Sequence, residues 1–380
     1  MSLKDLPRNS PPRCWAEIHL SALKQNARTC AALAGEHCGL MAIVKADAYG
    51  HGLEAVSTAL STEVDWFGVA NVREAFRARK AIGDAEVGIL VLSPATPEEI
   101  PEIVEAGFSG SVSSLGEMER YAEAARDRNR KARLHAVADT GMGRMGALKD
   151  EFPQLVSAIQ ESDDCILEGV ETHFPSADEE EDFTRSQIEI FREILAGLDL
   201  DDKCHIHLGN SAGLLGFQEM LPFATLARPG LALYGISPLP NIAASLSPAL
   251  TLKSRIALIR EIPEGTSISY GRTFTSDRPM RTATLGVGYG DGYPRHVSGQ
   301  GAEVLIEGKR CPLLGRVTMD QIVVDISQCS TDISCGDEVV LIGTQGDEKI
   351  STEEIASKAG SIPWEILTGI TSRVERLYLP

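Results

Sequence analysis

The chain has 380 residues, and its 36 Lys and Arg residues against 54 Asp and Glu residues give a formal net charge of −18. At this length one hydrophobic core rarely suffices, so we expect about two to three domains. Hydrophobic residues make up 43% of the chain and charged residues 24%, which is typical of a globular enzyme and excludes a disordered chain. An acidic surface repels phosphate backbones and anionic membranes, which argues against nucleic-acid or membrane binding as the main activity.

The sequence predicts a cytoplasmic protein without a metal. No apolar stretch approaches the roughly 20 residues of a spanning helix, and the N-terminal MSLKDLPRNSPPR lacks the apolar core of a secretory signal. The eight cysteines are scattered without a CxxC pair, so we expect reduced thiols rather than disulfides or a zinc site. His205 and His207 could lie on one strand face and hold a metal, but we favour one core or pocket histidine and one partner.

Between about residues 38 and 230, short β-rich runs alternate with amphipathic segments. Two helices of this kind are expected over Val72–Ile82 and Leu115–Arg130. The second starts after Ser113-Ser114, with Glu117 as a capping partner. Eight such strands predict an α/β fold, a TIM-like (β/α)₈ barrel over residues 14–245, with a doubly wound sheet as the alternative. The expected strands are Leu40–Ala46, Trp66–Asn71, Gly88–Ser93, Gly110–Ser114, Arg133–Asp139, Leu167–His173, His205–Asn210 and Thr225–Gly230.

The pattern changes after about residue 245, where short β-rich runs are separated by Gly, Pro, Asp and Ser. We therefore place a boundary near Pro240–Pro248 and predict a smaller β-rich C-terminal domain over residues 246–380. Its expected strands include Leu252–Ile259, Thr282–Val287, Ala302–Ile306, Gln321–Ile326 and Glu338–Ile342.

The segment Val44-Lys45-Ala46-Asp47-Ala48-Tyr49-Gly50-His51-Gly52 carries the clearest chemical signal. It places Lys45 at the carboxyl end of a buried apolar strand, and those ends form the active-site mouth of a barrel. Burial of an unpaired ammonium is costly, so a lysine there is suited to act as a neutral amine, either as an imine-forming nucleophile or as a base. A salt-bridged structural lysine would be the better interpretation if Lys45 stood alone.

Other polar motifs follow later strands of the predicted barrel. DTGMGRMG presents Arg144 from a glycine-rich loop, and His173 ends the sixth strand. Ser211 opens a short helix after the seventh strand, and Arg228-Pro229-Gly230-Leu231 ends the eighth, where many barrels bind phosphate. Each motif alone is more typical of structure than of function, but together they indicate a phosphorylated cofactor that forms an imine.

The segment VKADAYGHG closely resembles the pyridoxal-phosphate lysine motif of alanine racemases. DTGMGRMG, THF, HLGNSAG, ARPGLALYG, SYGRTF, GYGDGYPR and GRVTMDQ follow in the order that this family shows, from Trp15 to Val374. The resemblance implies a barrel followed by a β-rich domain. It also implies an isomerase that interconverts L- and D-alanine and so supplies D-alanine for peptidoglycan.

By this resemblance, Lys45 binds pyridoxal 5'-phosphate as an imine and later acts as the base on one face of the α-carbon. Tyr270 resembles the opposing base, which in this family comes from the other subunit, so a homodimer with shared active sites is implied. A tyrosine near its ordinary pKa of about 10 is a weak base, so nearby positive charge or hydrogen bonds must lower its pKa. His173 and Arg228 are the expected supporting network.

The resemblance assigns the remaining binding residues. Arg228 is expected to donate to the pyridine nitrogen, which then stays unprotonated and makes the ring a weaker electron sink. Arg144 and the Met319 backbone would hold the substrate carboxylate, with Asp320 as a weaker candidate. The phosphate contacts are expected from Tyr49, Ser211, Gly230 and Leu231, and the narrow entrance from Tyr289, Arg295 and Arg316.

Two positions depart from the family pattern. Many members have a lysine, often carbamylated, where this chain has Val137, so Arg144 must be oriented by a bound anion, by another carboxylate or more loosely. The usual tyrosine of an IPYE-like segment, which reaches the phosphate and lines the entrance, is Trp364 here. An indole N–H donates but cannot accept a hydrogen bond, so Trp364 bears on both phosphate affinity and entrance size.

Three alternatives stay open beside an alanine racemase. Trp364 leaves room for a broad-spectrum or serine-type racemase, since one methylene changes discrimination by only about 1–3 kcal/mol. A related decarboxylase is disfavoured because it would be expected to pair the pyridine nitrogen with an acid rather than Arg228. A non-catalytic cofactor-binding protein is disfavoured by the C-terminal domain that carries Tyr270.

Overall fold

The structure is a computed structural model that describes residues 11–239 and 246–380. It divides into two compact units. The first, Leu20–Ser247, is called the barrel unit here. The second combines Pro248–Pro380 with the N-terminal residues up to His19 and is called the β-rich unit. Residues 240–245, where the expected boundary begins, lie outside the described residues.

The barrel unit contains, within its described residues, eight parallel strands in the order β8-β7-β6-β5-β4-β3-β2-β9. The ring is closed by hydrogen bonds from Thr225 N–H to the Ile206 carbonyl and from Arg228 N–H to the Gly209 carbonyl, both 2.9 Å. The strands are β2 (Gly39–Ile43), β3 (Trp66–Val69), β4 (Gly88–Val91), β5 (Ser109–Val112), β6 (Ala132–Val137), β7 (Cys165–Glu171), β8 (His205–His207) and β9 (Leu226–Ala227). The predicted (β/α)₈ barrel is therefore confirmed.

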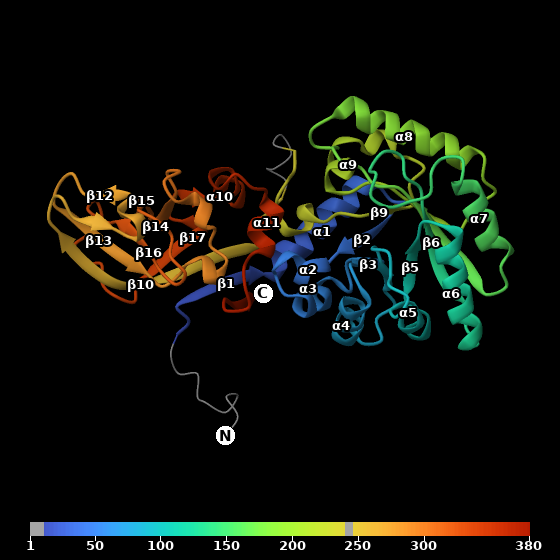
Figure 1. The fold of residues 1–380 in the computed structure, drawn as a ribbon, viewed down its shortest axis with the longest axis horizontal. Coiled ribbons are helices and arrows are strands. Elements are labelled where there is room, and N and C mark those ends of the chain that lie inside the picture. The colour runs from blue at the N-terminus through green and yellow to red at the C-terminus, as the bar shows by residue number, and fades with distance from the viewer. Residues whose placement is uncertain (1–10, 240–245) are drawn as a thin grey trace, which may run out of the picture. The chain divides into compact units, whose positions relative to one another are not determined.

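Helices cover the outside of these strands (Figure 1). The Asn71 side chain accepts the Glu74 N–H at 3.0 Å and caps one helix, a contact that was not predicted. Ser114 accepts the Glu117 N–H at 3.3 Å and caps another helix at the predicted start. The helices are α1 (Leu20–Ala34), α2 (Lys45–Tyr49), α3 (Leu53–Leu60), α4 (Val72–Ile82), α5 (Ile100–Ala106), α6 (Leu115–Asp127), α7 (Phe152–Glu161), α8 (Glu181–Ala196) and α9 (Ser211–Gly216), with short 3₁₀ turns η2 (Gln218–Met220) and η3 (Leu231–Tyr234).

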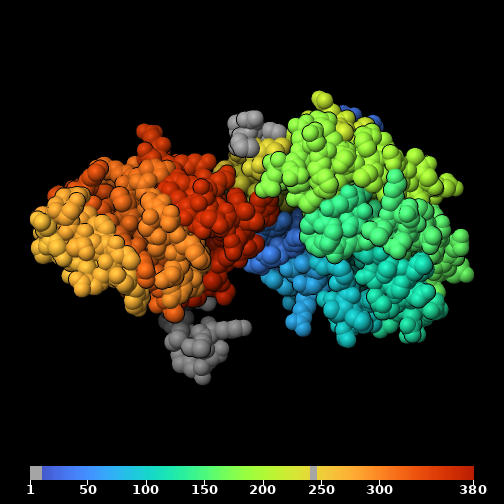
Figure 2. Space-filling model, turned by 45° about the horizontal axis from the view of Figure 1, so that its top comes forward, coloured from blue at the N-terminus to red at the C-terminus, as the bar shows by residue number. Residues whose placement is uncertain are grey.

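The β-rich unit is built, within its described residues, on a nine-stranded sheet in the order β18-β17-β14-β15-β16-β13-β10-β1-β19. Its strands are β1 (Cys14–His19), β10 (Leu250–Ile262), β13 (Met280–Leu285), β14 (Glu303–Ile306), β15 (Lys309–Leu314), β16 (Ile322–Asp325), β17 (Glu338–Gln345), β18 (Glu348–Ile350) and β19 (Glu375–Leu379). A small hairpin joins β11 (Ser267–Ile268) to β12 (Phe274–Thr275), and the helices are α10 (Thr352–Ala359) and α11 (Pro363–Thr368). Figure 2 shows the surface of this unit mainly in orange and red and that of the barrel unit in blue to yellow.

The N-terminal strand does not belong to the barrel, although the sequence placed the barrel domain from residue 14. β1 runs antiparallel to β10, with Cys14 opposite Ser254, and parallel to β19, with Trp15 opposite Glu375. Both of its edges are therefore paired within the β-rich sheet. A short apolar run in the sequence does not reveal which distant strand it joins, so the expected domain start differs from the structure here.

Candidate active site

Lys45 follows the carboxyl end of β2 and begins a left-handed turn. The expected strand extended to residue 46, but β2 ends at Ile43. The four residues after Lys45, Ala46–Tyr49, have φ values of 53°, 55°, 54° and 52°. Left-handed helical backbone costs roughly 1–2 kcal/mol for each such residue, so surrounding contacts must hold this turn.

Two carboxylates supply those contacts. Glu74 on α4 accepts the Ala46 N–H at 2.9 Å. Asp47 accepts the Leu53 N–H at 3.2 Å and pairs with Arg77 at 2.8 Å. The strained turn is thus fixed at both of its ends, and this gives Lys45 and Tyr49 defined positions at the barrel mouth.

The half-buried amine of Lys45 lies in a positive field. Burial lowers its pKa most, Arg144 and Arg228 lower it further, and Glu74 opposes them. These effects favour the neutral amine that a nucleophile or a base requires. The proximity of Lys45, Arg144 and Arg228 also agrees with their expected convergence on one face of the barrel.

Arg144 is presented by a tight loop after β6. Asp139 organises the loop by accepting the N–H groups of Gly141 at 2.9 Å and Gly143 at 3.1 Å. The Arg144 side chain is exposed and forms no ion pair or hydrogen bond within the described residues. Val137, which replaces the family's lysine, lies opposite Glu171 in the β6–β7 ladder, but that carboxylate pairs with Arg228 instead.

The guanidinium of Arg228 is 3% exposed and extensively bonded. It donates to the carbonyls of Thr172 at 2.6 Å and His207 at 2.7 Å, and its Nη1 lies 2.7 Å from His207 Nδ1. Glu171 lies 3.2 Å from Nη1, and His173 Nδ1 lies 3.3 Å from Nη2. All of these contacts use Nη1 or Nη2, so the Nε–H has no partner among the described residues and is available to a ligand.

His173 adjoins Arg228 as expected. Burial lowers the pKa of its imidazole to about 3, and the positive charges of Arg228, Arg144 and Lys45 contribute further. His173 is therefore neutral near pH 7.

The predicted phosphate residues come together at the starts of α9 and η3. Ser211 Oγ accepts the N–H groups of Gly230 at 2.9 Å and Ala232 at 3.1 Å, which leaves its own O–H free to donate to a ligand. A Cβ on Gly230 would lie 2.6 Å from the Tyr49 hydroxyl, so only glycine leaves room for that phenol. Burial raises the pKa of Tyr49 to about 12, which keeps it a donor. Leu231 begins η3, whose first N–H groups lack intrahelical acceptors.

In the β-rich unit, Tyr270 and Arg316 lie close together. Tyr270 starts the 3₁₀ turn η5 (Tyr270–Arg272) and is 69% exposed. The preceding Ser269 donates to the Arg316 carbonyl at 2.6 Å, and a Cβ on Gly271 would lie 2.9 Å from the Arg316 guanidinium. The phenol therefore projects from a turn that Arg316 supports.

Tyr289 begins the 3₁₀ turn η6 (Tyr289–Asp291), which packs against the loop that carries Met319. The Tyr289 N–H donates to Thr318 at 3.0 Å and the Gly290 N–H to Met319 at 2.9 Å. Asp320 pairs with Arg373 at 2.8 Å, so its carboxylate is already engaged.

The last two predicted residues lie on other elements of the β-rich unit. Arg295 is exposed on η7 (Arg295–Val297). Trp364 is half-buried on α11. The functional roles of all these residues remain predictions.

Sequence reasoning missed several polar groups of the barrel. Glu74 lies within a run that was expected to be helical, but its side-chain contacts with the N–H groups of Ala70 and Ala46 have no signal in the sequence. Glu171 and His135 lie inside predicted strands. A polar side chain in an otherwise apolar run indicates a buried group that needs a partner, and this was the signal the sequence offered. His207 contacts both Arg228 and His135, while His205 packs edge-on against Trp66.

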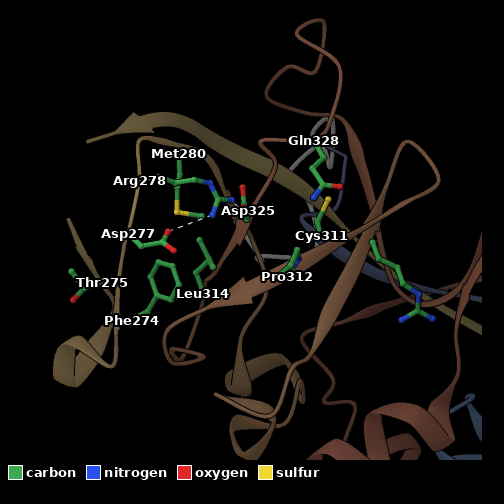
Figure 3. A pocket seen from close by; sticks show the side chains of 11 residues that line it. Phe274, Thr275, Asp277, Arg278, Met280, Cys311, Pro312, Leu314, Asp325 and Gln328 are labelled. Atoms are coloured by element: carbon green, nitrogen blue, oxygen red, sulfur yellow. Dashed lines mark hydrogen bonds and ion pairs between the residues drawn. The ribbon is translucent and has the colours of Figure 1, made fainter. Parts of the chain in front are cut away.

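A separate cavity of about 400 Å³ lies in the β-rich unit and contains none of the predicted site residues. Figure 3 shows Arg278 beside Asp277 and Asp325 at this cavity. Arg310, also in its wall, pairs with Glu303, Glu348 and Glu354. Because these cations are already compensated, the cavity offers no evident site for a charged ligand.

Among the residues that the structure describes, no group of three or more His, Cys, Asp and Glu side chains could hold a metal ion. None of the helices in residues 11–239 and 246–380 is long and apolar enough to span a membrane.

Comparison with known proteins connects this geometry to a family. The model of the alanine racemase N-terminal domain matches residues 18–238, and that of the alanine racemase C-terminal domain matches residues 249–378. The chain belongs to the alanine racemase family. The resemblance and the fold predicted from the sequence are thereby confirmed.

Individual members of the alanine racemase family match over almost their whole length. The alanine racemase of Methylacidiphilum infernorum is 39% identical over 374 residues, which cover 97% of this chain and 93% of the relative. The crystal structure of alanine racemase from Streptomyces lavendulae, a producer of D-cycloserine, superposes with a TM-score of 0.89 at 35% identity, covering 98% of both chains. The Bartonella henselae alanine racemase, solved with covalently bound pyridoxal phosphate, has a TM-score of 0.88 at 27% identity, covering 97% of this chain and all of that one (100%).

Proposed function

We propose that this member of the alanine racemase family interconverts L- and D-alanine with pyridoxal 5'-phosphate. The observation that carries the proposal is the convergence of Lys45, Arg144 and Arg228 at the barrel mouth in a chain of this family. The enzyme acts in the cytoplasm as a homodimer, and its D-alanine supplies peptidoglycan synthesis.

The residues of the barrel unit fit the cofactor. Ser211 and Tyr49 retain hydroxyl donors for a phosphate, and the glycine at position 230 keeps the space beside Tyr49 open. Lys45 offers an amine whose pKa is lowered, and Arg228 offers its Nε–H. The bound cofactor supplies an aldehyde that condenses with amines and a ring that stabilises negative charge at the α-carbon.

Arg228 sets the strength of that ring as an electron acceptor. A guanidinium cannot give up its proton in a protein, so Arg228 donates to the pyridine nitrogen without protonating it. With the cofactor bound, the ring would then stabilise negative charge at the α-carbon less strongly. The role of Arg228 would therefore be to favour racemisation over transamination.

Two groups exchange protons with the α-carbon from opposite faces. Lys45 serves one face, where burial and the charges of Arg144 and Arg228 lower its pKa and so favour the neutral amine that can accept a proton. The phenol of Tyr270, provided by the partner subunit, serves the other face. Because each group can remove or return the proton, the two enantiomers interconvert in both directions.

The substrate is oriented by its carboxylate. Arg144, which has no carboxylate partner among the described residues, is available for this ion pair. The Met319 backbone, with Asp320 as a weaker contributor, completes the carboxylate site. Tyr289, Arg295 and Arg316 narrow the entrance and favour a methyl side chain.

A second candidate function is a racemase of broader specificity that also accepts serine. The half-buried Trp364 on α11, in the position of the family's tyrosine, favours it. Comparing kcat/KM for L-alanine and L-serine in the enzyme and in Trp364→Tyr distinguishes the two. Equal efficiency with both substrates would favour the broader function.

Solvent deuterium incorporation at the α-carbon of alanine tests the main proposal. Lys45→Ala and Tyr270→Phe should each abolish interconversion, since each removes one of the two proton-transfer groups. Lys149→Ala and Tyr378→Phe, which alter a surface lysine and a surface tyrosine, serve as matched controls and should retain activity. Normal turnover in either active-site variant would reject the two-base assignment.

A further inference from the structure

Strand β7 places two glutamates inside the barrel. In the β6–β7 ladder, Leu134 lies opposite Leu167 but the next residue, His135, lies opposite Gly169, so Glu168 is an extra residue in β7. Such a bulge redirects a side chain. Strict alternation would point residues three apart to opposite faces. Glu168 nevertheless accepts from Ser109 and Glu171 from Ser111, and these serines lie two apart on β5 and therefore share one face.

Gly169 makes room for this arrangement. A Cβ at that position would lie 2.4 Å from His135 Nδ1 and 2.7 Å from its Cε1. No real side chain tolerates such an approach, so the bulge and the buried His135 ring depend on glycine. The bulge and Gly169 together therefore leave room for polar side chains inside the barrel.

A continuous row of polar side chains connects the two glutamates. His135 Nδ1 lies 2.7 Å from His207 Nε2, and His207 Nδ1 lies 2.7 Å from Arg228 Nη1. His135 Nε2 faces Glu168 Oε2 at 3.5 Å, and Glu171 Oε2 lies 3.2 Å from Arg228 Nη1. Both imidazoles are fully buried.

Arg228 fixes the direction of every hydrogen bond in this row. A guanidinium only donates, and His207 Nδ1 lies 2.7 Å from Arg228 Nη1 but 3.5 Å from Glu171 Oε2, so this nitrogen accepts from Arg228 and the His207 proton sits on Nε2. That Nε2–H donates to His135 Nδ1, which places the His135 proton on Nε2, towards Glu168. Burial and the charge of Arg228 keep His207 neutral, because both lower its pKa.

Carboxylates at both ends complete the row. Glu168 accepts from Ser109 and Arg133 as well as facing His135. Burial would raise its pKa, but these partners hold it at about 2, so Glu168 stays ionised. Glu171 accepts from Ser111 at 2.9 Å and compensates the charge of Arg228.

We propose that Glu171 and Glu168 are positioning residues for Arg228, and that the row from Glu168 through His135 and His207 locks both imidazoles in their Nε2–H tautomers. Glu171 balances the buried guanidinium directly, while Glu168 acts through the two histidines. Together they aim the remaining Nε–H of Arg228 at the pyridine nitrogen. This inference rests on the proposed function, but its first test does not need activity.

The tautomers can be observed in the wild-type protein. In ¹⁵N-histidine-labelled full-length protein, long-range ¹H–¹⁵N correlation at pH 7 distinguishes protonated from unprotonated imidazole nitrogens. His207 and His135 should each show a protonated Nε2 and a bare Nδ1. A proton on Nδ1 of His207 would overturn the inference, whether or not the chain racemises alanine.

Substitution tests the positioning role in the holoenzyme. Glu171→Gln should lower kcat by about 100-fold, as small misplacements of active-site groups do, with KM for alanine changed less than about threefold. The absorbance of the bound cofactor should shift as well, and Glu168→Gln should act in the same direction more weakly. Glu193→Gln, which removes a surface ion pair with Lys149, is the matched control.

Unchanged kcat and cofactor absorbance in folded Glu171→Gln would overturn the positioning role. If Glu171→Gln does not fold, the inference is still tested by the histidine tautomers of the wild-type protein and by the cofactor absorbance of Glu168→Gln. If Glu171→Gln or Glu168→Gln lost racemase activity while the histidine tautomers and the cofactor absorbance stayed as in the wild type, that result would count against the inference. An inactive wild-type chain with the expected tautomers would instead count against the proposed function alone.

Discussion

The carboxylate of Glu74 accepts the backbone N–H of Ala46 at 2.9 Å and so anchors the left-handed turn that follows Lys45. Its second oxygen accepts the Ala70 N–H at 2.8 Å, just beyond the carboxyl end of β3. One side chain therefore ties together two neighbouring strand ends. It is also the negative charge that opposes the lowering of the Lys45 pKa.

Glu74→Gln should lower the pKa of Lys45 further, because the amide removes the charge that favours the ammonium. It should also loosen the turn, since an amide has one acceptor oxygen where the carboxylate has two. The pH dependence of Lys45 reductive methylation, followed by mass spectrometry in cofactor-free protein, measures the change. The midpoint should move to lower pH.

Glu63→Gln provides the control for this shift, because Glu63 pairs with Arg28 on the surface. It should leave the labelling midpoint of Lys45 where it is. A midpoint in Glu74→Gln that equals or exceeds that of the wild type would contradict the role assigned to Glu74.

Gly169→Ala should destabilise the barrel unit by about 1–3 kcal/mol, the usual cost of forcing an extra group into a packed interior. The added Cβ would meet the His135 ring at 2.4 Å. Denaturant unfolding measures the loss. Gly116→Ala, on the exposed side of α6, is the control and should be neutral or stabilising by up to about 1 kcal/mol. Equal stability of the two variants would show that the His135 ring moves freely.

The order and approximate bounds of the barrel's strands and helices could be predicted from the sequence because they depend on local patterns. Val72–Ile82 forms a helix with the predicted bounds, and Ser114 caps α6 as expected. Apolar runs bounded by turn residues located the strands, and the ordered motifs identified the family. Each of these signals depends on residues that are close together in the chain, so the sequence alone reveals it.

The polar interior could not be predicted in the same way. Alternation along β7 assigns Glu168 and Glu171 to opposite faces, and only the bulge brings both inside. Gly169 within a strand was a signal for such a bulge, but nothing local identified His135 as its partner. The start of the barrel domain was misplaced for a similar reason, since Cys14–His19 pairs with strands more than two hundred residues away.

Gly230→Ala should weaken cofactor binding by about tenfold. The new Cβ would lie 2.6 Å from the Tyr49 hydroxyl, and relieving an overpacked contact of this kind costs about 1–3 kcal/mol, where 1.4 kcal/mol is a factor of ten. The dissociation constant of pyridoxal phosphate, measured by equilibrium dialysis of reconstituted protein, reports the change. Gly209→Ala is a matched buried control, because its Cβ would meet no atom closer than 3.4 Å. Equal dissociation constants for the two variants would remove Tyr49 from the phosphate site.

The stability of the protein should fall as the pH decreases from about 6.5 towards 3. The folded state holds the pKa of His173 at about 3, against an ordinary value of 6.5. Between these values the unfolded chain binds a proton that the folded chain does not, so acid favours unfolding. One such group contributes at most about 1.4 kcal/mol per pH unit across this window.

Denaturant unfolding at a series of pH values measures this slope. His173→Gln removes the titrating group, so the variant should lose stability less steeply than the wild type over the same window. His37→Gln, an exposed histidine on the same unit, should leave the slope unchanged. If His173→Gln and the wild type had parallel profiles, His173 would have to titrate normally in the folded protein. It would then be charged at mildly acidic pH beside Arg228, and its assignment as a neutral member of the network would fail.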